Sequence, residues 1–328
     1  MAEQGAAPKQ FSYGGQAVIE GVMMRGAHVA AVAVRDPNGG IVVHEQTLNA
    51  TLYRGRISKT PFIRGVVGLW DALGLGTRAL MWSADVALGV EENGEKPSFN
   101  GPLGWGTLAF SLVLSIGLFF LLPTAAASGI ERLLSLEHSS VLVNLIEGLV
   151  RLVLIVGYVW AISFMPDVKR LFGYHGAEHK TINAYEAGAE LIPEVVTNYP
   201  IEHPRCGTAF LLTVVFVSVV LFSFFGRPAF IWLVISRIVL IPVVAGIAYE
   251  YIRFTAKHMD SPIVRALIVP NLLLQHLTTR QPDLTMIEVA ITAFKRVLVS
   301  EKLLAETDLA PAAEQPRTPV TTPSPVGD

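Results

Sequence analysis

His175, Glu178 and His179 have the H-x-x-E-H spacing that occurs in metal-dependent hydrolases. On an α-helix, residues four apart lie on one face, so His175 and His179 can bind one divalent cation, most simply zinc, through neutral imidazoles. Glu178 lies beside them and can act as general base toward a water molecule that the cation activates. The segment predicts a metal site with a catalytic carboxylate. An ordinary pair of surface histidines has the same spacing and is the competing interpretation.

A zinc site needs at least one further protein ligand. His203 and Cys206, three residues apart and directly before an apolar segment, are the best candidates. Glu186 shares the face of the two histidines, but a straight helix places it about 10 Å beyond His179, too far to bind the same ion. It is therefore an outer partner or alternative ligand. Three ligands would leave a position for water, whereas four would make the site structural, and the sequence permits both.

Two other glutamates are candidates for the same cluster. Glu250 follows a long apolar segment and can approach the level of the histidines, as an alternative ligand or as a hydrogen-bond partner of a ligand. Glu20 and Arg25 are the polar residues of an apolar run near the N-terminus, where they either form a buried pair or point into the site. The glycines Gly14 and Gly15 of that run do not match a phosphate-binding motif, so we expect no nucleotide site.

The composition indicates a membrane protein. Of 328 residues, 52% are hydrophobic and 16% are charged, and the mean hydropathy is +0.49. A formal charge of -2 gives no reason to expect nucleic acid as a partner. Cys206 is the single cysteine, which excludes an internal disulfide and fits a reducing compartment. Residues 1–16 contain no apolar segment that would act as a signal peptide, and we expect them to be flexible.

Four apolar segments have about the 20 residues that a membrane-crossing helix needs. They are Trp105–Ser128, Val141–Met165, Gly207–Phe225 and Ala229–Ile252. The predicted fold is therefore a mainly α, polytopic bundle of about four spans over residues 101–260, with the lipid bilayer as partner. Lysine and arginine are concentrated in the loop 166–206 and after the fourth segment. The positive-inside rule places this loop and both termini in the cytoplasm of a bacterium, with the bundle in the inner membrane.

Three charged residues fall inside these segments. Glu147 and Arg151 are four residues apart in the second segment, and Arg237 lies in the fourth at a similar depth. Because charges in a bilayer are costly, we expect one ionic network between the two helices. It can be a structural clamp or can line a polar path. A small transporter is disfavoured, because four spans without internal repeats suit alternating access poorly.

The flanking regions predict a small N-terminal cytoplasmic α+β lobe at residues 17–100. The apolar runs Val29–Val34 and Ile41–Val43 flank the turn sequence Asp36–Gly40, which indicates a β-hairpin. From Pro61 to Leu88 the periodicity is helical, which predicts a helix at the membrane interface or over the lobe. Residues 261–302 predict a cytoplasmic amphipathic segment. The Pro- and Thr-rich tail, residues 303–328, should be disordered.

Three motifs carry a family resemblance: Gly14–Arg25, Gly173–Thr181 and His203–Gly207. They resemble the YqhQ-like family of uncharacterised bacterial membrane proteins, over roughly residues 11–302. That family is described as predicted metal-dependent enzymes, so the resemblance implies a membrane location and a metal but no reaction.

The leading hypothesis from the sequence is a metal-dependent membrane hydrolase acting on a peptide or a lipid-linked ester at the cytoplasmic face. The alternative is a non-catalytic membrane scaffold or regulator with a structural metal or none. The sequence identifies no substrate and permits a homo-oligomer.

Overall fold

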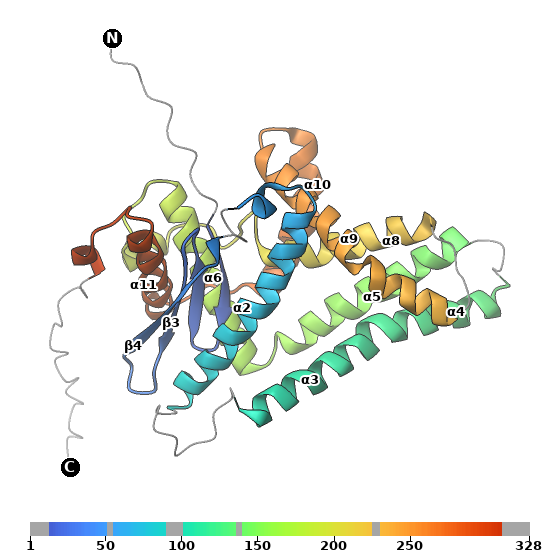
Figure 1. Cartoon of the computed structure of the whole chain (residues 1–328), viewed down its shortest axis with the longest axis horizontal. Helices are drawn as coiled ribbons and strands as arrows, with labels where there is room; N and C mark the ends of the chain where they lie inside the picture. The colour runs from blue at the N-terminus through green and yellow to red at the C-terminus, as the bar shows by residue number, and fades with distance from the viewer. Residues whose placement is uncertain (1–12, 51–54, 90–100, 136–139, 225–229, 310–328) are drawn as a thin grey trace, which may run out of the picture.

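The computed structural model describes residues 13–50, 55–89, 101–135, 140–224 and 230–309. It combines an α+β lobe with an elongated group of helices (Figure 1). The first strand begins at Gly14, inside the segment expected to be flexible, and a 3-10 turn, η3 (Glu306–Leu309), lies in the predicted disordered tail. Residues 1–12 and 310–328 fall outside the described residues.

The lobe contains a four-stranded antiparallel sheet in the order β1-β2-β3-β4. Its strands are β1 (Gly14–Val18), β2 (Gly21–Arg25), β3 (Val29–Arg35) and β4 (Ile41–Thr47). The predicted hairpin is confirmed, because β3 pairs with β4 across the Asp36–Gly40 turn, with Arg35 opposite Ile41. The hairpin of β1 and β2 was not predicted. Its turn contains Glu20 at a φ of 52°, a conformation for which glycine or asparagine is the usual signal.

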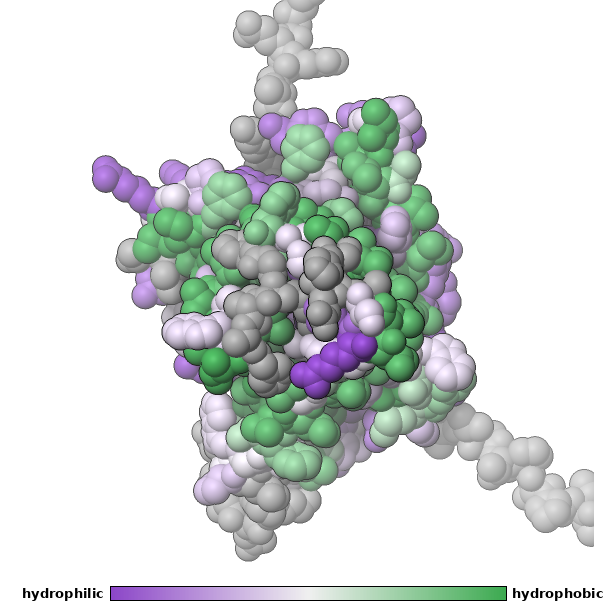
Figure 2. Space-filling view, turned by 90° about the vertical axis from the view of Figure 1, so that its right-hand side faces the viewer, coloured by the Kyte–Doolittle hydropathy of each residue, from purple (hydrophilic) through white to green (hydrophobic). Residues whose placement is uncertain are grey.

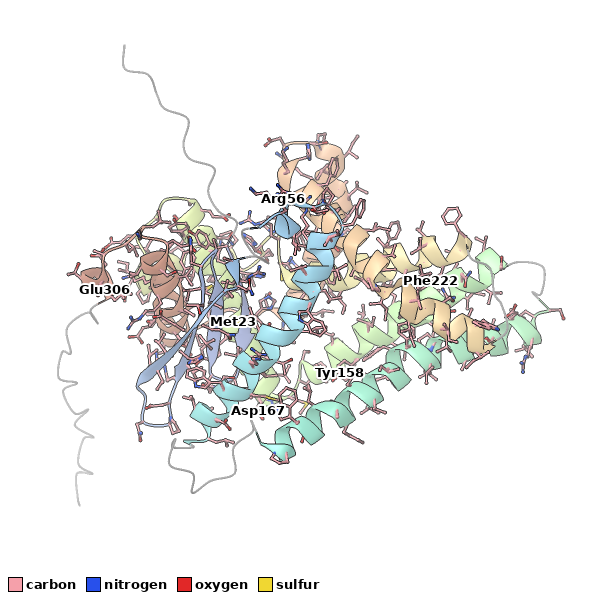
Figure 3. The ribbon with its side chains drawn as sticks, in the orientation of Figure 1. Met23, Arg56, Tyr158, Asp167, Phe222 and Glu306 are labelled. Atoms are coloured by element: carbon pink, nitrogen blue, oxygen red, sulfur yellow. The ribbon has the colours of Figure 1, made fainter. Side chains whose placement is uncertain are left out.

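Helices cover both faces of this sheet. Ala31 and Ala33 of β3 pack under α11 (Leu284–Ser300), while Val32 and Val34, which alternate with them, face α2 (Ile63–Ala87). Met23 belongs to the second of these layers, and Figure 3 labels it between the sheet and α2. The C-terminal helix of the predicted segment 261–302 is therefore part of the lobe core. This helix, α11, is the amphipathic part of that segment, and its hydrophobic face is buried against β2 and β3.

The apolar helices are arranged as α3 (Pro102–Ile116), a π-helical turn η2 (Gly117–Leu121) and α4 (Leu122–Leu133) in one continuous rod, followed by α5 (Ser140–Ile162), α8 (Gly207–Phe224), α9 (Phe230–Lys257) and α10 (Pro262–Thr278). Three of the predicted spans are long and apolar enough to cross a membrane: Gly104–Leu133, Ser140–Ile162 and Ile231–Lys257. For the fourth, α8 supplies a shorter apolar stretch, Phe210–Phe224. Hydrophobic side chains dominate the face seen along the helices in Figure 2.

The predicted loop 166–206 is largely helical. It contains α6 (Pro166–Glu186) and the short α7 (Pro193–Val196). Helix α6 packs against β1, β2 and α11, so it is a core element of the lobe. Helix α10 packs against α8 and α5 despite Pro270 in its interior. As a result, the chain before α8 is enclosed between α6 and the end of α10.

Candidate metal centre and buried charge network

The centre of the candidate site is formed by two elements that are distant in sequence. Helix α6 supplies His175 and His179, and the residue directly before α8 supplies Cys206. One donor atom from each of the three residues lies within 4.8 Å of the other two. His175 Nε2 is 3.2 Å from Cys206 Sγ, and the rings of the two histidines have centroids 4.4 Å apart. Two nitrogens and one sulfur at this separation match the donor types of zinc.

Backbone carbonyls fix how both imidazoles point. His175 Nδ1 donates to the carbonyl of Thr278 at 2.8 Å, and His179 Nδ1 donates to the carbonyl of Ile201. A carbonyl can only accept, so each Nδ1 carries the proton and each Nε2 presents a lone pair toward the centre. His179 Nε2 is buried and has no hydrogen-bond partner within the described residues. An imidazole with Nδ1 held and Nε2 free is the usual state of a metal ligand.

The segment that carries Cys206 is fixed to α6 by side-chain hydrogen bonds. Lys180 Nζ donates to the carbonyls of Thr197, at 2.8 Å, and Tyr199, and burial lowers the pKa of this lysine. The Gln275 side chain of α10 donates to the carbonyl of His203 and accepts from its N–H, both at 2.9 Å. These contacts hold the chain before α8 in place, and with it the thiol.

Glu178 lies beside the two histidines and outside the group of three donors. Its Oε2 is 3.9 Å from His175 Nε2 and 3.8 Å from His179 Nε2. Only 5% of the residue is exposed, and this burial raises its pKa, an effect that the His175 ring and a hydrogen bond from the Gly15 backbone oppose. A Cβ on Gly15 would lie 2.8 Å from Glu178 Cγ and 2.6 Å from the Met23 carbonyl oxygen. Strand β1 can therefore touch the carboxylate only because residue 15 is glycine.

Of the other proposed ligands, His203 and Glu186 lie next to the centre without entering it. His203 Nδ1 accepts from the N–H of Arg205 at 3.3 Å, and its Nε2 faces Glu186 Oε2 at 3.6 Å. Burial lowers the pKa of His203. Burial acts to raise the pKa of Glu186, but His203 and an ion pair with Arg205 outweigh it, so this carboxyl titrates below its usual range. Neither residue belongs to the donor group.

Glu20 and Glu250 are engaged by other partners. Glu20, in the turn between β1 and β2, pairs with Arg170 and accepts from the Tyr174 hydroxyl at 3.2 Å. Glu250 of α9 pairs with Arg64 of α2. The sequence did not reveal these arginine partners, because they lie on elements whose docking depends on the tertiary fold.

The structure brings Glu147, Arg151 and Arg237 together among α4, α5, α8 and α9. The two carboxylate oxygens of Glu147 lie 2.9 Å from Arg151 Nη2 and 3.2 Å from Arg237 Nη2. Arg237 also donates to Asn144 Oδ1 at 3.0 Å, and its guanidinium covers the ring of Phe222, which Figure 3 labels. All three charges are at most 6% exposed, so the arginines do not extend outward.

The π-helical turn η2 takes part in this network. Arg151 Nε donates to the carbonyl of Phe119 at 3.1 Å, within the turn. A π turn widens the spacing of backbone hydrogen bonds, which leaves a carbonyl for a side-chain donor. Proline at 123 is a sequence signal for this gap, because it lacks the N–H that would donate to the Phe119 carbonyl four residues earlier.

Comparisons with known proteins agree with the resemblance seen in the motifs. The family described as "Protein of unknown function (DUF1385)" matches residues 60–300. The chain is also 36% identical, over 304 residues, to "Uncharacterized protein YqhQ" of Bacillus subtilis (strain 168), which covers 89% of this chain and 94% of the relative. The chain belongs to the YqhQ-like family. No solved structure matches the chain. All three donors of the candidate centre lie within the matched range.

Proposed function

We propose that this protein is a membrane-embedded, metal-dependent hydrolase with His175, His179 and Cys206 as metal ligands and Glu178 as general base. The observation that carries the proposal is the convergence of three donors beside a buried carboxylate. The buried Nε2 of His179 supports it further, because it has no hydrogen-bond partner among the described residues and such an atom is costly to bury unless something binds it. Zinc suits this donor set best.

A bound zinc ion would act as a Lewis acid that lowers the pKa of water. The protein's own residues would then orient and deprotonate the nucleophile. Glu178 would take the proton, and the burial that raises its pKa makes the carboxylate a stronger base. The carbonyls of Thr278 and Ile201 would keep both imidazoles fixed during this transfer. Three protein ligands leave room for water, as catalytic zinc sites require.

The membrane part of the proposal rests on the apolar helices. We place the α3–α4 rod, α5, α8 and α9 across the inner membrane of a bacterium as four spans. Helix α8 is included because it packs between α5 and α9 and supplies Ser218 to Arg151 at 3.4 Å. The basic residues of 166–206 favour the cytoplasm for the lobe and both termini. Since Cys206 directly precedes α8, the centre would lie at the membrane surface, within reach of a peptide or a lipid-linked ester.

Burial of the centre favours one alternative, a structural metal in a non-catalytic scaffold or regulator. His179 is 1% exposed and Cys206 is 5% exposed. The carboxylate of Glu178 is also close enough to both histidines to become a fourth ligand after a small shift, which would close the site.

Metal analysis of detergent-purified protein separates these functions. We expect about one zinc per chain in the wild type, most of it lost in His179→Ala and retained in Glu178→Gln, because a base is not needed to bind the ion. Loss of zinc in Glu178→Gln equal to that in His179→Ala would make Glu178 a ligand and favour the structural site. A wild type without stoichiometric metal would refute the metal centre.

A further inference from the structure

Helix α2 has two apolar faces: one packs against the sheet, and four large side chains of the other are exposed, although Met81 and Ala84 toward the end of the helix are buried on that side. Leu75, Ala79, Trp82 and Val86 pack against the layer of the sheet that contains Met23 and Val32. Ile63, Trp70, Leu73 and Leu80 are exposed by 51%, 76%, 60% and 38%, respectively. At 3.6 residues per turn, the two sets lie on opposite faces of the helix. We refer to the second set as the outer face of α2.

A helix that only covered a sheet would present polar side chains to water on its far side. Large exposed hydrophobic patches mark contact with another protein or a membrane. The outer face contains a tryptophan that is three-quarters exposed, a residue that is enriched where a membrane meets water. The outer face of α2 therefore requires an apolar partner.

The position of α2 favours a bilayer as that partner. In Figure 1, α2 runs steeply across the ends of the apolar helices, between the sheet and the bundle, from the end of α9 toward the start of α3. Its first turn packs closely against α9. A Cβ on Gly65 would lie only 3.0 Å from the Cα of Gly246, so the two backbones can approach this closely because residue 65 is glycine. Helix α2 is thereby attached to the C-terminal half of a candidate span, Ile231–Lys257.

The charges around α2 agree with a membrane surface. Arg56 and Lys59, both exposed, precede the helix, and Figure 3 labels Arg56 beside α10. Arg78 is exposed on the flank between the two apolar faces, and Asp85 lies on the same flank two turns later, so this flank carries both signs of charge. The basic residues that precede the helix suit the anionic headgroups of a bilayer.

We propose that the outer face of α2 is seated in the headgroup and acyl boundary of an anionic bilayer, parallel to its surface, with the sheet held on the opposite face. This inference goes beyond the proposed hydrolase activity, because it assigns a lipid-binding surface whether or not the centre is catalytic. It means that the lobe is attached to the membrane by α2 as well as by the ends of the spans.

Site-directed spin labelling of the full chain in phosphatidylethanolamine and phosphatidylglycerol vesicles tests the proposal. Leu73→Cys reports on the outer face, Arg78→Cys is the matched control on the flank of the same helix, and Asn38→Cys in the β3–β4 turn is the aqueous control. Leu149→Cys, on an exposed position of α5, is the lipid control. Cys206, the native cysteine, is buried and should react little with the label. The wild type, treated with the label in the same way, measures this background.

We expect the nitroxide at position 73 to be relaxed several-fold more by oxygen than by a water-soluble nickel complex, as at position 149, with the opposite preference at positions 78 and 38. If the label at position 73 prefers nickel while the label at 149 is exposed to lipid, the proposal that α2 lies in the bilayer is wrong, whereas the assignment of the spans still holds. If the spectrum at position 73 shows dipolar broadening and the label is protected from both reagents, the outer face contacts a second copy of the chain. That result would also overturn the proposal. Water exposure at 149 would overturn both the spans and this inference.

Discussion

Replacing Glu147 by glutamine should destabilise the bundle far more than the same change on the surface. The carboxylate is 2% exposed and accepts from Arg151 at 2.9 Å, from Arg237 at 3.2 Å and from Thr124 at 3.3 Å. Glutamine keeps the shape of the side chain but removes the negative charge that pairs with Arg151 and Arg237. Removing one partner of a buried ion pair typically costs about 3–5 kcal/mol, because the other charge stays buried without compensation.

The unfolding free energy can be measured by titrating the protein in mild detergent with a denaturing detergent. Glu288→Gln is the control, because Glu288 pairs with Arg35 at 2.8 Å but is 54% exposed, and such pairs contribute about 0–1 kcal/mol. A double variant with Arg237→Met should lose less stability than the sum of the single changes, since the two side chains interact. Equal losses for Glu147→Gln and Glu288→Gln, with additive effects in the double variant, would refute the buried network.

Three further predictions concern the lobe and the topology. Gly15→Ala should lower the unfolding free energy by about 1–3 kcal/mol, because its Cβ would clash with strand and carboxylate, whereas Gly14→Ala, whose Cβ meets nothing within 4 Å, should be nearly neutral in thermal unfolding. The pKa of Glu20 is lowered from 4.5, first by its hydrogen bond from arginine. Its stabilising effect is therefore complete above pH 4.5 and lost as the pH falls through the lowered pKa, so denaturant titrations below pH 5 should show a smaller acid loss in Glu20→Gln than in the wild type. Reporter fusions after Asp260 should be active in the cytoplasm and those after Leu134 in the periplasm, and periplasmic activity at Asp260 would reverse the topology.

The elements with local signals could be predicted from the sequence. The β3–β4 hairpin has a dense turn sequence at Asp36–Gly40, and the long apolar runs identify helices because their length and composition suffice. The span over Gly207–Phe225 was predicted from hydropathy alone, and the described helix α8 ends at Phe224 with a shorter apolar stretch. The hairpin of β1 and β2 was missed because its turn is formed by Glu20, not by a typical turn residue.

The candidate site shows the same division between local and tertiary information. The i, i+4 spacing places His175 and His179 on one face of any helix, so their proximity follows from the sequence. The choice of Cys206 over His203 does not, because it depends on Gln275 of α10 holding the segment before α8. The glycine at position 15 carries no motif of its own. Its role becomes visible only when strand β1 lies against Glu178.

X-ray absorption at the zinc edge of purified, zinc-loaded protein tests the central claim most directly. Coordination by His175, His179 and Cys206 predicts one sulfur at about 2.3 Å and two imidazole nitrogens at about 2.0–2.1 Å, with any remaining scatterer a light atom. In Cys206→Ser the sulfur contribution should vanish. A wild-type spectrum without sulfur, or one unchanged by Cys206→Ser, would contradict the proposed metal centre.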